Sequence, residues 1–209
     1  MGAFGNFIAS GGSWMYAILS IMIVSLAIII ERFIVLNFRN RIDSAAFVNK
    51  VMELIQRGNL AGAVEFCSMS QAALPRIARA GLEESAKSNG DVQNAMEVAA
   101  MNEIPKIERR TPYLSLLANI ATLLGLLGTI FGLIDSFQAV TSADASQKAT
   151  LLAAGIAVAM NTTAFGLIVA IPSLVFYSML NERTTHITDE INENAARIYQ
   201  RLSQIRGQR

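Results

Sequence analysis

The stretch TPYLSLLANIATLLGLLGTIFGLI, residues 111–134, contains no charged side chain. A helix needs roughly 20 apolar residues at ~1.5 Å each to cross about 30 Å of hydrocarbon, so this stretch is long enough to span a membrane. Residues 149–181 form another uncharged run, and the first charged side chain of the chain is Glu31. Three such runs exclude a soluble globular protein and predict three membrane-spanning helices.

The composition supports this conclusion and excludes several functions. Of the 209 residues 53% are hydrophobic and 16% are charged, against roughly 25% charged in soluble proteins. The net charge of +1 gives no reason to expect a nucleic-acid surface. Cys67 and His186 are the only residues of their kinds, which excludes an intrachain disulfide, a histidine metal site with several ligands and a spare catalytic base. We therefore expect neither an enzyme nor a metal protein.

The charges that flank the runs predict the topology. Lys and Arg gather between the first and second runs and after the third, whereas the link between the second and third carries only Lys148. By the positive-inside rule the N-terminus and this link lie outside, and the long loop and the tail are cytoplasmic. The predicted order is an outer N-terminus at 1–12, spans at 13–31, 111–136 and 149–181, a helical cytoplasmic loop at 32–110, an outer link at 137–148 and a helical cytoplasmic tail at 182–209.

The cytoplasmic parts are also predicted to be helical, which gives an all-α membrane protein with long helices that extend into the cytoplasm. Asp91 is the expected N-cap of a helix that continues into the second span, with kinks at Pro105 and Pro112. In the tail, apolar residues recur mostly four apart and predict an amphipathic continuation of the third span. These residues are Ile187, Ile191, Ala195, Ile198 and Leu202.

Polar and small residues inside the spans allow two interpretations. The second span carries a stripe of polar residues on one helical face, formed by Ser115, Asn119, Thr122, Thr129 and Ser136, and the third carries Asn161, Thr162 and Thr163. Such residues can line a narrow polar route, yet Ser, Thr and Gly are also usual where membrane helices pack closely. Apart from Asp135 at the outer end of the second span, neither span contains Asp, Glu, Lys, Arg or His. If protons cross here, we expect the essential carboxylate to come from another subunit.

Several strings resemble the MotA/TolQ/ExbB proton-channel family, in its ExbB/TolQ branch. They are ANIATLLGLLGTIFGLIDSF (residues 118–137), GIAVAMNTTAFGLIVAIPSLVFY (155–177) and the loop strings RGNLAGAVEFC (57–67) and ALPRIARAGL (73–82). The resemblance extends over nearly the whole chain from about Trp14. The sequence departs from the family pattern at Val158, where ExbB and TolQ commonly carry Glu.

The resemblance implies a pentameric ring of three-span subunits around two copies of an ExbD- or TolR-like single-span partner that supplies an Asp. It implies that Thr129 and Thr163 face the ion path; Thr162 and Asn161 are further candidates. Helix packing is assigned to Gly125, Gly128, Gly132, Gly166 and Pro172. The coupling ion would be H+, with Na+ as the alternative, and no cofactor is expected.

By the same resemblance, the chain would lie in the inner membrane of a Gram-negative bacterium, with its outer segments in the periplasm. There it would convert ion-motive force into mechanical work on a periplasmic or outer-membrane system. Two alternatives stay open. One is a non-conducting helical scaffold of such a complex. The other is a stand-alone transporter, which the lack of intramembrane charge and of inverted repeats disfavours.

Overall fold

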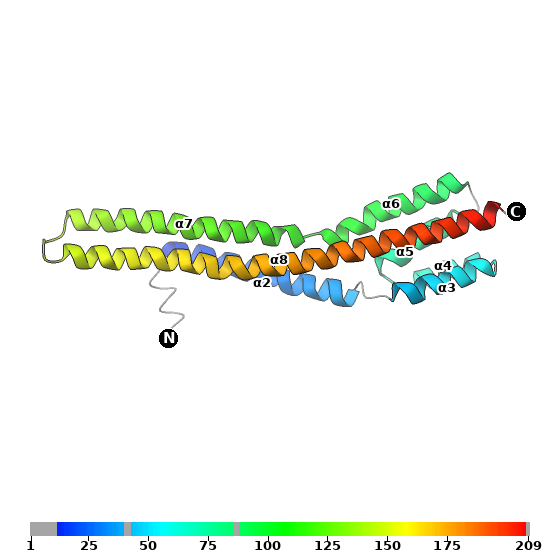
Figure 1. Cartoon of the computed structure of the whole chain (residues 1–209), viewed down its shortest axis with the longest axis horizontal. Coiled ribbons are helices and arrows are strands. Elements are labelled where there is room, and N and C mark those ends of the chain that lie inside the picture. The colour runs from blue at the N-terminus through cyan, green and yellow to red at the C-terminus, as the bar shows by residue number, and fades with distance from the viewer. Residues whose placement is uncertain (1–11, 40–42, 86–87, 208–209) are drawn as a thin grey trace. The chain divides into compact units, whose positions relative to one another are not determined.

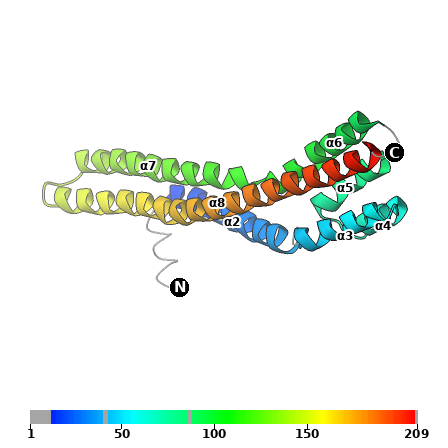
Figure 2. The same cartoon turned by 45° about the vertical axis from the view of Figure 1, so that its right-hand side comes forward.

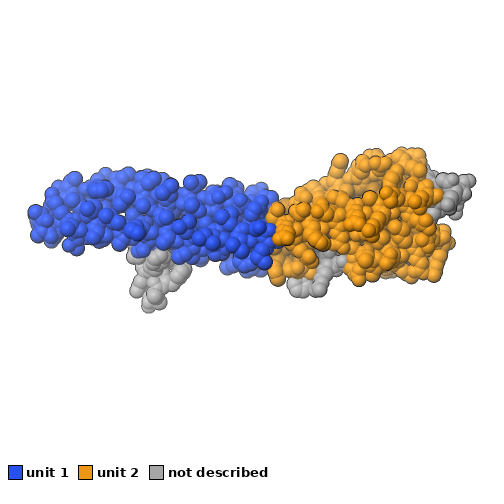
Figure 3. Space-filling view, in the orientation of Figure 1, with its two compact units in different colours: residues 1–31, 110–179 blue, residues 32–109, 180–209 orange. Residues whose placement is uncertain are grey.

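A computed structural model describes residues 12–39, 43–85 and 88–207 of the chain. Every regular element in these ranges is helical, and they contain no strand. Three helices are long and apolar enough to cross a membrane, which confirms the predicted all-helical class with three candidate spans. The chain divides into two compact units, unit 1 (residues 1–31 and 110–179) and unit 2 (residues 32–109 and 180–209), coloured separately in Figure 3.

Unit 1 is built from α2 (Ser13–Ile34), α7 (Thr111–Thr141) and the first part of α8 (Lys148–Gly207), which lie side by side (Figures 1 and 2). Its core combines large side chains of α2 and α8 with small side chains of α7. The core residues are Met15, Ile18, Ala118, Ala121, Phe165, Val169 and Ala170. Because α7 presents alanine and glycine to its neighbours, the helix axes can approach closely.

The connection into α7 differs from the expected continuous helix. Helix α6 (Asn89–Glu108) ends before Arg109, and Arg110 adopts a left-handed backbone conformation with φ of 73° before α7 begins. A non-glycine residue in that conformation ends a helix and is uncommon. Within unit 1 the Arg110 guanidinium forms an ion pair with the Glu31 carboxylate at the end of α2. The prediction of one kinked helix was therefore wrong, because the chain stops one helix and starts another.

Unit 2 contains the remaining elements. They are η1 (Val35–Arg39), a short π-helical segment, followed by α3 (Ser44–Gln56), α4 (Leu60–Ser68), α5 (Ala73–Glu83), α6 and the last part of α8. Side-chain caps begin three of these helices: Asp43 caps α3, Asn59 caps α4 and Ser88 caps α6. Ser88 and Asp91 form a reciprocal capping box. The predicted N-cap Asp91 is thus the third residue of the first turn and not the cap.

The last part of α8 buries one apolar stripe in unit 2. Ile187, Ile191, Ile198 and Leu202 are buried, and Ala195 is half-buried. The polar positions between them are exposed or half-buried, apart from the buried Asn194, as expected for a helix with one apolar face. The amphipathic tail helix predicted from the sequence is confirmed. Its apolar face completes the core that α3 to α6 form.

Candidate intramembrane site

Helices α7 and α8 touch through their backbones where two glycines face each other in unit 1. A Cβ atom on Gly166 would lie 2.7 Å from the Ala121 carbonyl oxygen and 3.1 Å from the Gly125 Cα. A Cβ on Gly125 would lie 3.2 Å from the Thr163 Cα. Only glycine fits at Gly166, and a Cβ at Gly125 would require the α8 backbone to shift by a few tenths of an ångström, so this pair sets how near the two helices come. We call the line of contact between α7 and α8 the glycine seam.

The other residues predicted to pack helices take different places. Gly128 and Gly132 continue along the glycine seam, where an added Cβ would meet Thr162 and Ala159 respectively. Pro172 lies inside α8 and is exposed in the single chain. Its role in helix packing stays a prediction.

Thr129 and Thr163 lie opposite each other across the glycine seam, and their hydroxyl oxygens are in hydrogen-bond contact. The Thr129 hydroxyl also lies 3.2 Å from the carbonyl oxygens of Gly125 and of Ala159. The Thr163 hydroxyl lies 3.0 Å from the same Gly125 carbonyl. Both side chains are half-buried, so the pair is packed on one side and reachable on the other.

The chemistry of this threonine pair follows from counting donors and acceptors. Two hydroxyls supply two protons, and each hydroxyl oxygen can accept as well. The two carbonyl oxygens beside them add further lone pairs. Acceptor sites therefore outnumber donors, which favours a group that brings a proton or a positive charge. The pair can bind such a group through hydrogen bonds but cannot itself change its charge, because threonine hydroxyls do not titrate in water.

Thr162 and Asn161, the other two predicted path residues, are not joined to the threonine pair. The Thr162 side chain is 1% exposed and its hydroxyl donates to the Val158 carbonyl at 3.0 Å, one turn earlier in α8. Asn161 is half-buried, and within the described ranges its side-chain amide has no hydrogen-bond partner. Their assignment to an ion path stays a prediction.

Sequence reasoning missed how the carbonyl oxygens take part in the site. Thr129 follows Gly125 by four residues, the spacing at which a threonine hydroxyl reaches back to a carbonyl in its own helix. That signal was readable. The second contact, from Thr163 of α8 to the same Gly125 oxygen, depends on how near the helices come and has no local sequence signal.

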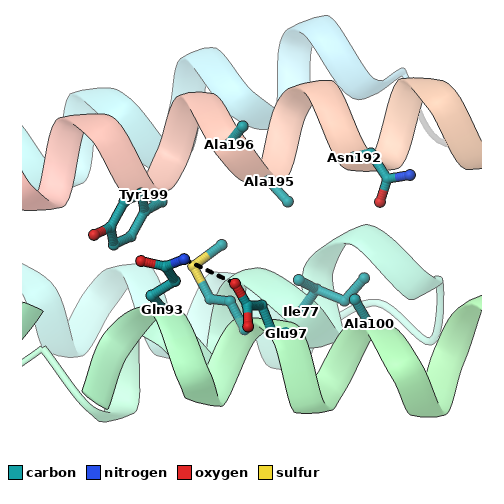
Figure 4. A pocket seen from close by; sticks show the side chains of 9 residues that line it. Ile77, Gln93, Glu97, Ala100, Asn192, Ala195, Ala196 and Tyr199 are labelled. Carbon is teal, nitrogen blue, oxygen red and sulfur yellow. Dashed lines mark hydrogen bonds between the residues drawn. The ribbon is translucent and has the colours of Figure 1, made fainter. Parts of the chain in front are cut away.

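Elsewhere, the described part of the chain contains no cluster of three or more His, Cys, Asp or Glu arranged to hold a metal. Unit 2 has a groove of about 240 Å3 between α6 and α8, with Ile77 of α5 at its base (Figure 4). Met96 and Ala195 are among the apolar residues that line it, and Gln93 donates a hydrogen bond to Glu97 at 2.8 Å. The residues that line this groove do not resemble a catalytic arrangement.

Cys67 of α4 is expected to be chemically inert. The thiol is 1% exposed, and burial raises its pKa from 9.0 to about 11, against a smaller lowering by the Arg79 charge. Below that pKa the thiol stays neutral, and the thiolate is the species that reacts. We expect alkylation by iodoacetamide at pH 8 to be about 100-fold slower than for an exposed cysteine. Mass spectrometry of the intact protein measures this rate.

The matched control for this experiment moves the thiol by one residue. Ser68→Cys in a Cys67→Ser background places it on the exposed side of the same helix. If Cys67 reacted as fast as this relocated cysteine, the packing around α4 would have to be different.

The glycine seam and the threonine pair define a multi-pass helical membrane protein with an uncharged polar site between two spans. Comparison with known proteins agrees with this class. The model of the MotA/TolQ/ExbB proton channel family matches residues 69–193, and the chain belongs to that family. The match includes α5, α6, α7 and most of α8, and hence both threonines.

Individual relatives agree with the family. The chain is 30% identical over 185 residues to the Tol-Pal system protein TolQ of Haemophilus influenzae, covering 83% of this chain and 80% of that protein. It is 29% identical over 185 residues to a putative biopolymer transport protein ExbB homolog of Methanothermobacter thermautotrophicus, covering 88% of this chain and 64% of that protein. Among solved structures, C. jejuni MotAB matches with a TM-score of 0.62 at 16% identity, covering 89% of this chain and 74% of that one. This last likeness is one of fold.

Proposed function

We propose that the chain is an inner-membrane subunit of an ion-driven motor, which conducts ions only together with a partner. In this proposal five copies form a ring around the single-span helices of two copies of an ExbD- or TolR-like partner. Flow of H+, or alternatively Na+, through the ring drives mechanical work on a periplasmic or outer-membrane system. The chain itself is not an enzyme and needs no cofactor. Family membership supports the motor role in general terms.

The observation that carries the proposal is the threonine pair. Two half-buried hydroxyls with an excess of acceptor sites lie between spans whose only Asp, Glu, Lys, Arg or His is Asp135, at the outer end of the second predicted span. A proton carrier in a membrane needs a group that can change its charge. A carboxylic acid on a partner helix would donate to these oxygens when protonated and accept from the same hydroxyls when ionised. The excess of acceptors favours the protonated carboxylic acid, and the two hydroxyl protons provide donors for its ionised form.

The topology and location in the proposal rest on the flanking charges and on the relatives. The positive-inside rule places the N-terminus and the link between α7 and α8 on the periplasmic side. Unit 2 would then lie in the cytoplasm, in agreement with its mostly polar exposed surface. The Gram-negative inner membrane is the corresponding location.

The test is conduction in liposomes. The chain is purified with the single-span, Asp-bearing protein encoded beside its gene and reconstituted with a pH-sensitive dye inside. Under a potassium diffusion potential we expect proton flux at least about tenfold above that of liposomes with the chain alone, because only the complex has a titratable group in the membrane. Radioactive sodium replaces the dye to test Na+.

The rival is a non-conducting scaffold. The glycine seam favours it, since close backbone packing alone explains the small residues of α7. A complex that assembles with its partner and carries neither H+ nor Na+ would establish the scaffold and exclude the motor.

A further inference from the structure

The hydroxyl stripe of α7 becomes more exposed from Ser136 to Thr122, and Ser115 beyond it is half-buried. Ser136 is 5% exposed, Thr129 is half-buried at the threonine pair, and Thr122 is exposed. These residues are spaced by seven, and seven residues fall about 20° short of two full helical turns. Between Ser136 and Thr122 the stripe therefore winds slowly out of the glycine seam.

At the Thr141 end the glycine seam leaves no room beside the stripe. A Cβ on Gly155 of α8 would overlap the Ser136 side chain, so the two helices close directly over that hydroxyl. Ser136 also donates to the Gly132 carbonyl of its own helix. An ion at the threonine pair thus finds no polar space along this end of the seam.

At the Thr111 end the stripe is accompanied by an amide. Asn119 is exposed, and among the described residues its side chain has no hydrogen-bond partner. Thr122, nearby on the same side of the helix, donates to the Ala118 carbonyl at 3.1 Å, and its oxygen can still accept. An amide without partners in hydrocarbon costs several kcal/mol. The Asn119 amide therefore needs water or a polar partner, although the apolar side chains of Leu123 and Leu126 beside it are also exposed.

We infer that Asn119 and Thr122 line a water-filled arm of the ion route, which leads from the threonine pair to the Thr111 end of α7. The inference rests on the proposed function and its topology, which place that end at the cytoplasm. Water satisfies the Asn119 amide, and the exposed stripe supplies further hydrogen bonds along the way. The arm gives the route a direction: the pair is closed toward Ser136 and open toward Thr122.

Cysteine accessibility tests the arm directly. Asn119→Cys and Thr122→Cys are made in a Cys67→Ser background, which removes the only native thiol. The complex with its partner is kept in inverted membrane vesicles and treated with a positively charged, membrane-impermeant methanethiosulfonate. Because such reagents attack thiolates in water, we expect both cysteines to react at least about tenfold faster than controls in apolar surroundings.

The controls are Ile23→Cys and Leu26→Cys in α2, whose native side chains are 60% and 55% exposed and apolar. Reaction of Asn119→Cys and Thr122→Cys at the rate of these controls would overturn the arm, whether lipid or another copy of the chain covers the face. Labelling does not require conduction. A complex that conducts but leaves both cysteines unlabelled refutes only the arm, whereas one that labels but does not conduct refutes the proposed function.

Discussion

Replacing Thr129 and Thr163 together by valine is expected to reduce ion flux at least about 100-fold while the complex still assembles. Each hydroxyl that contacts a charged or protonated partner group is worth roughly 1.5–3 kcal/mol, and tenfold in rate corresponds to about 1.4 kcal/mol. Valine keeps the β-branched shape, so the packing of α7 on α8 changes little. Flux in liposomes and the yield of the purified complex measure the two effects separately.

Two control variants make this result specific to the pair. Serine at both positions keeps the hydroxyls and should retain most of the flux. Thr162→Val removes a hydroxyl that is buried and bonded to the Val158 carbonyl, and we expect less than about a threefold effect on flux. Normal flux through the double valine variant would remove the threonine pair from the ion path.

Gly166→Leu is expected to prevent assembly altogether. The new side chain would start 2.7 Å from the Ala121 carbonyl oxygen, and backbone atoms cannot move aside as a flexible side chain can. Extra volume in a packed core typically destabilises a protein by about 1–3 kcal/mol. Because this clash is with backbone atoms, we expect a destabilisation of about 3 kcal/mol or more. We expect recovery of folded complex from detergent extracts to fall below about a tenth of wild type.

Trp14 provides an independent readout of this variant. It is the only tryptophan and it stacks on Phe131 of α7, with ring centroids 5.3 Å apart. Separation of the helices should change its fluorescence. Gly90→Leu is the matched control, since a Cβ there would meet only the Ser88 hydroxyl at 3.7 Å. Wild-type recovery and fluorescence for Gly166→Leu would contradict the described contact between α7 and α8.

Much of the fold could be predicted from where charges are absent. The spans follow from uncharged runs, and the tail helix follows from its apolar period, because both are properties of one segment at a time. The break at Arg110 could not be predicted, since arginine has no preference for a left-handed backbone. The cap was also ambiguous from sequence, because Ser88 and Asp91 are both good capping residues and only the structure decides between them.

The candidate residues of the site could be predicted from the sequence, but the choice among them could not. Spacing places Thr162 about 100° around the helix from Thr163, but it does not say which of them α8 turns toward α7. The glycine contacts decide this: Thr162 packs its methyl group against Gly128, and Thr163 meets Thr129. Contacts between helices therefore select the site from residues that look equivalent in the sequence.

The contact between the two threonine hydroxyls also bears on whether a subunit inserted without its partner would leak ions. Each hydroxyl already has a protein oxygen within hydrogen-bond distance, so in the single subunit both hydroxyl protons have protein acceptors. A subunit that is inserted before its partner arrives would stay sealed and would not dissipate the gradient of the cell. In the proposed complex, the partner group would replace these internal hydrogen bonds.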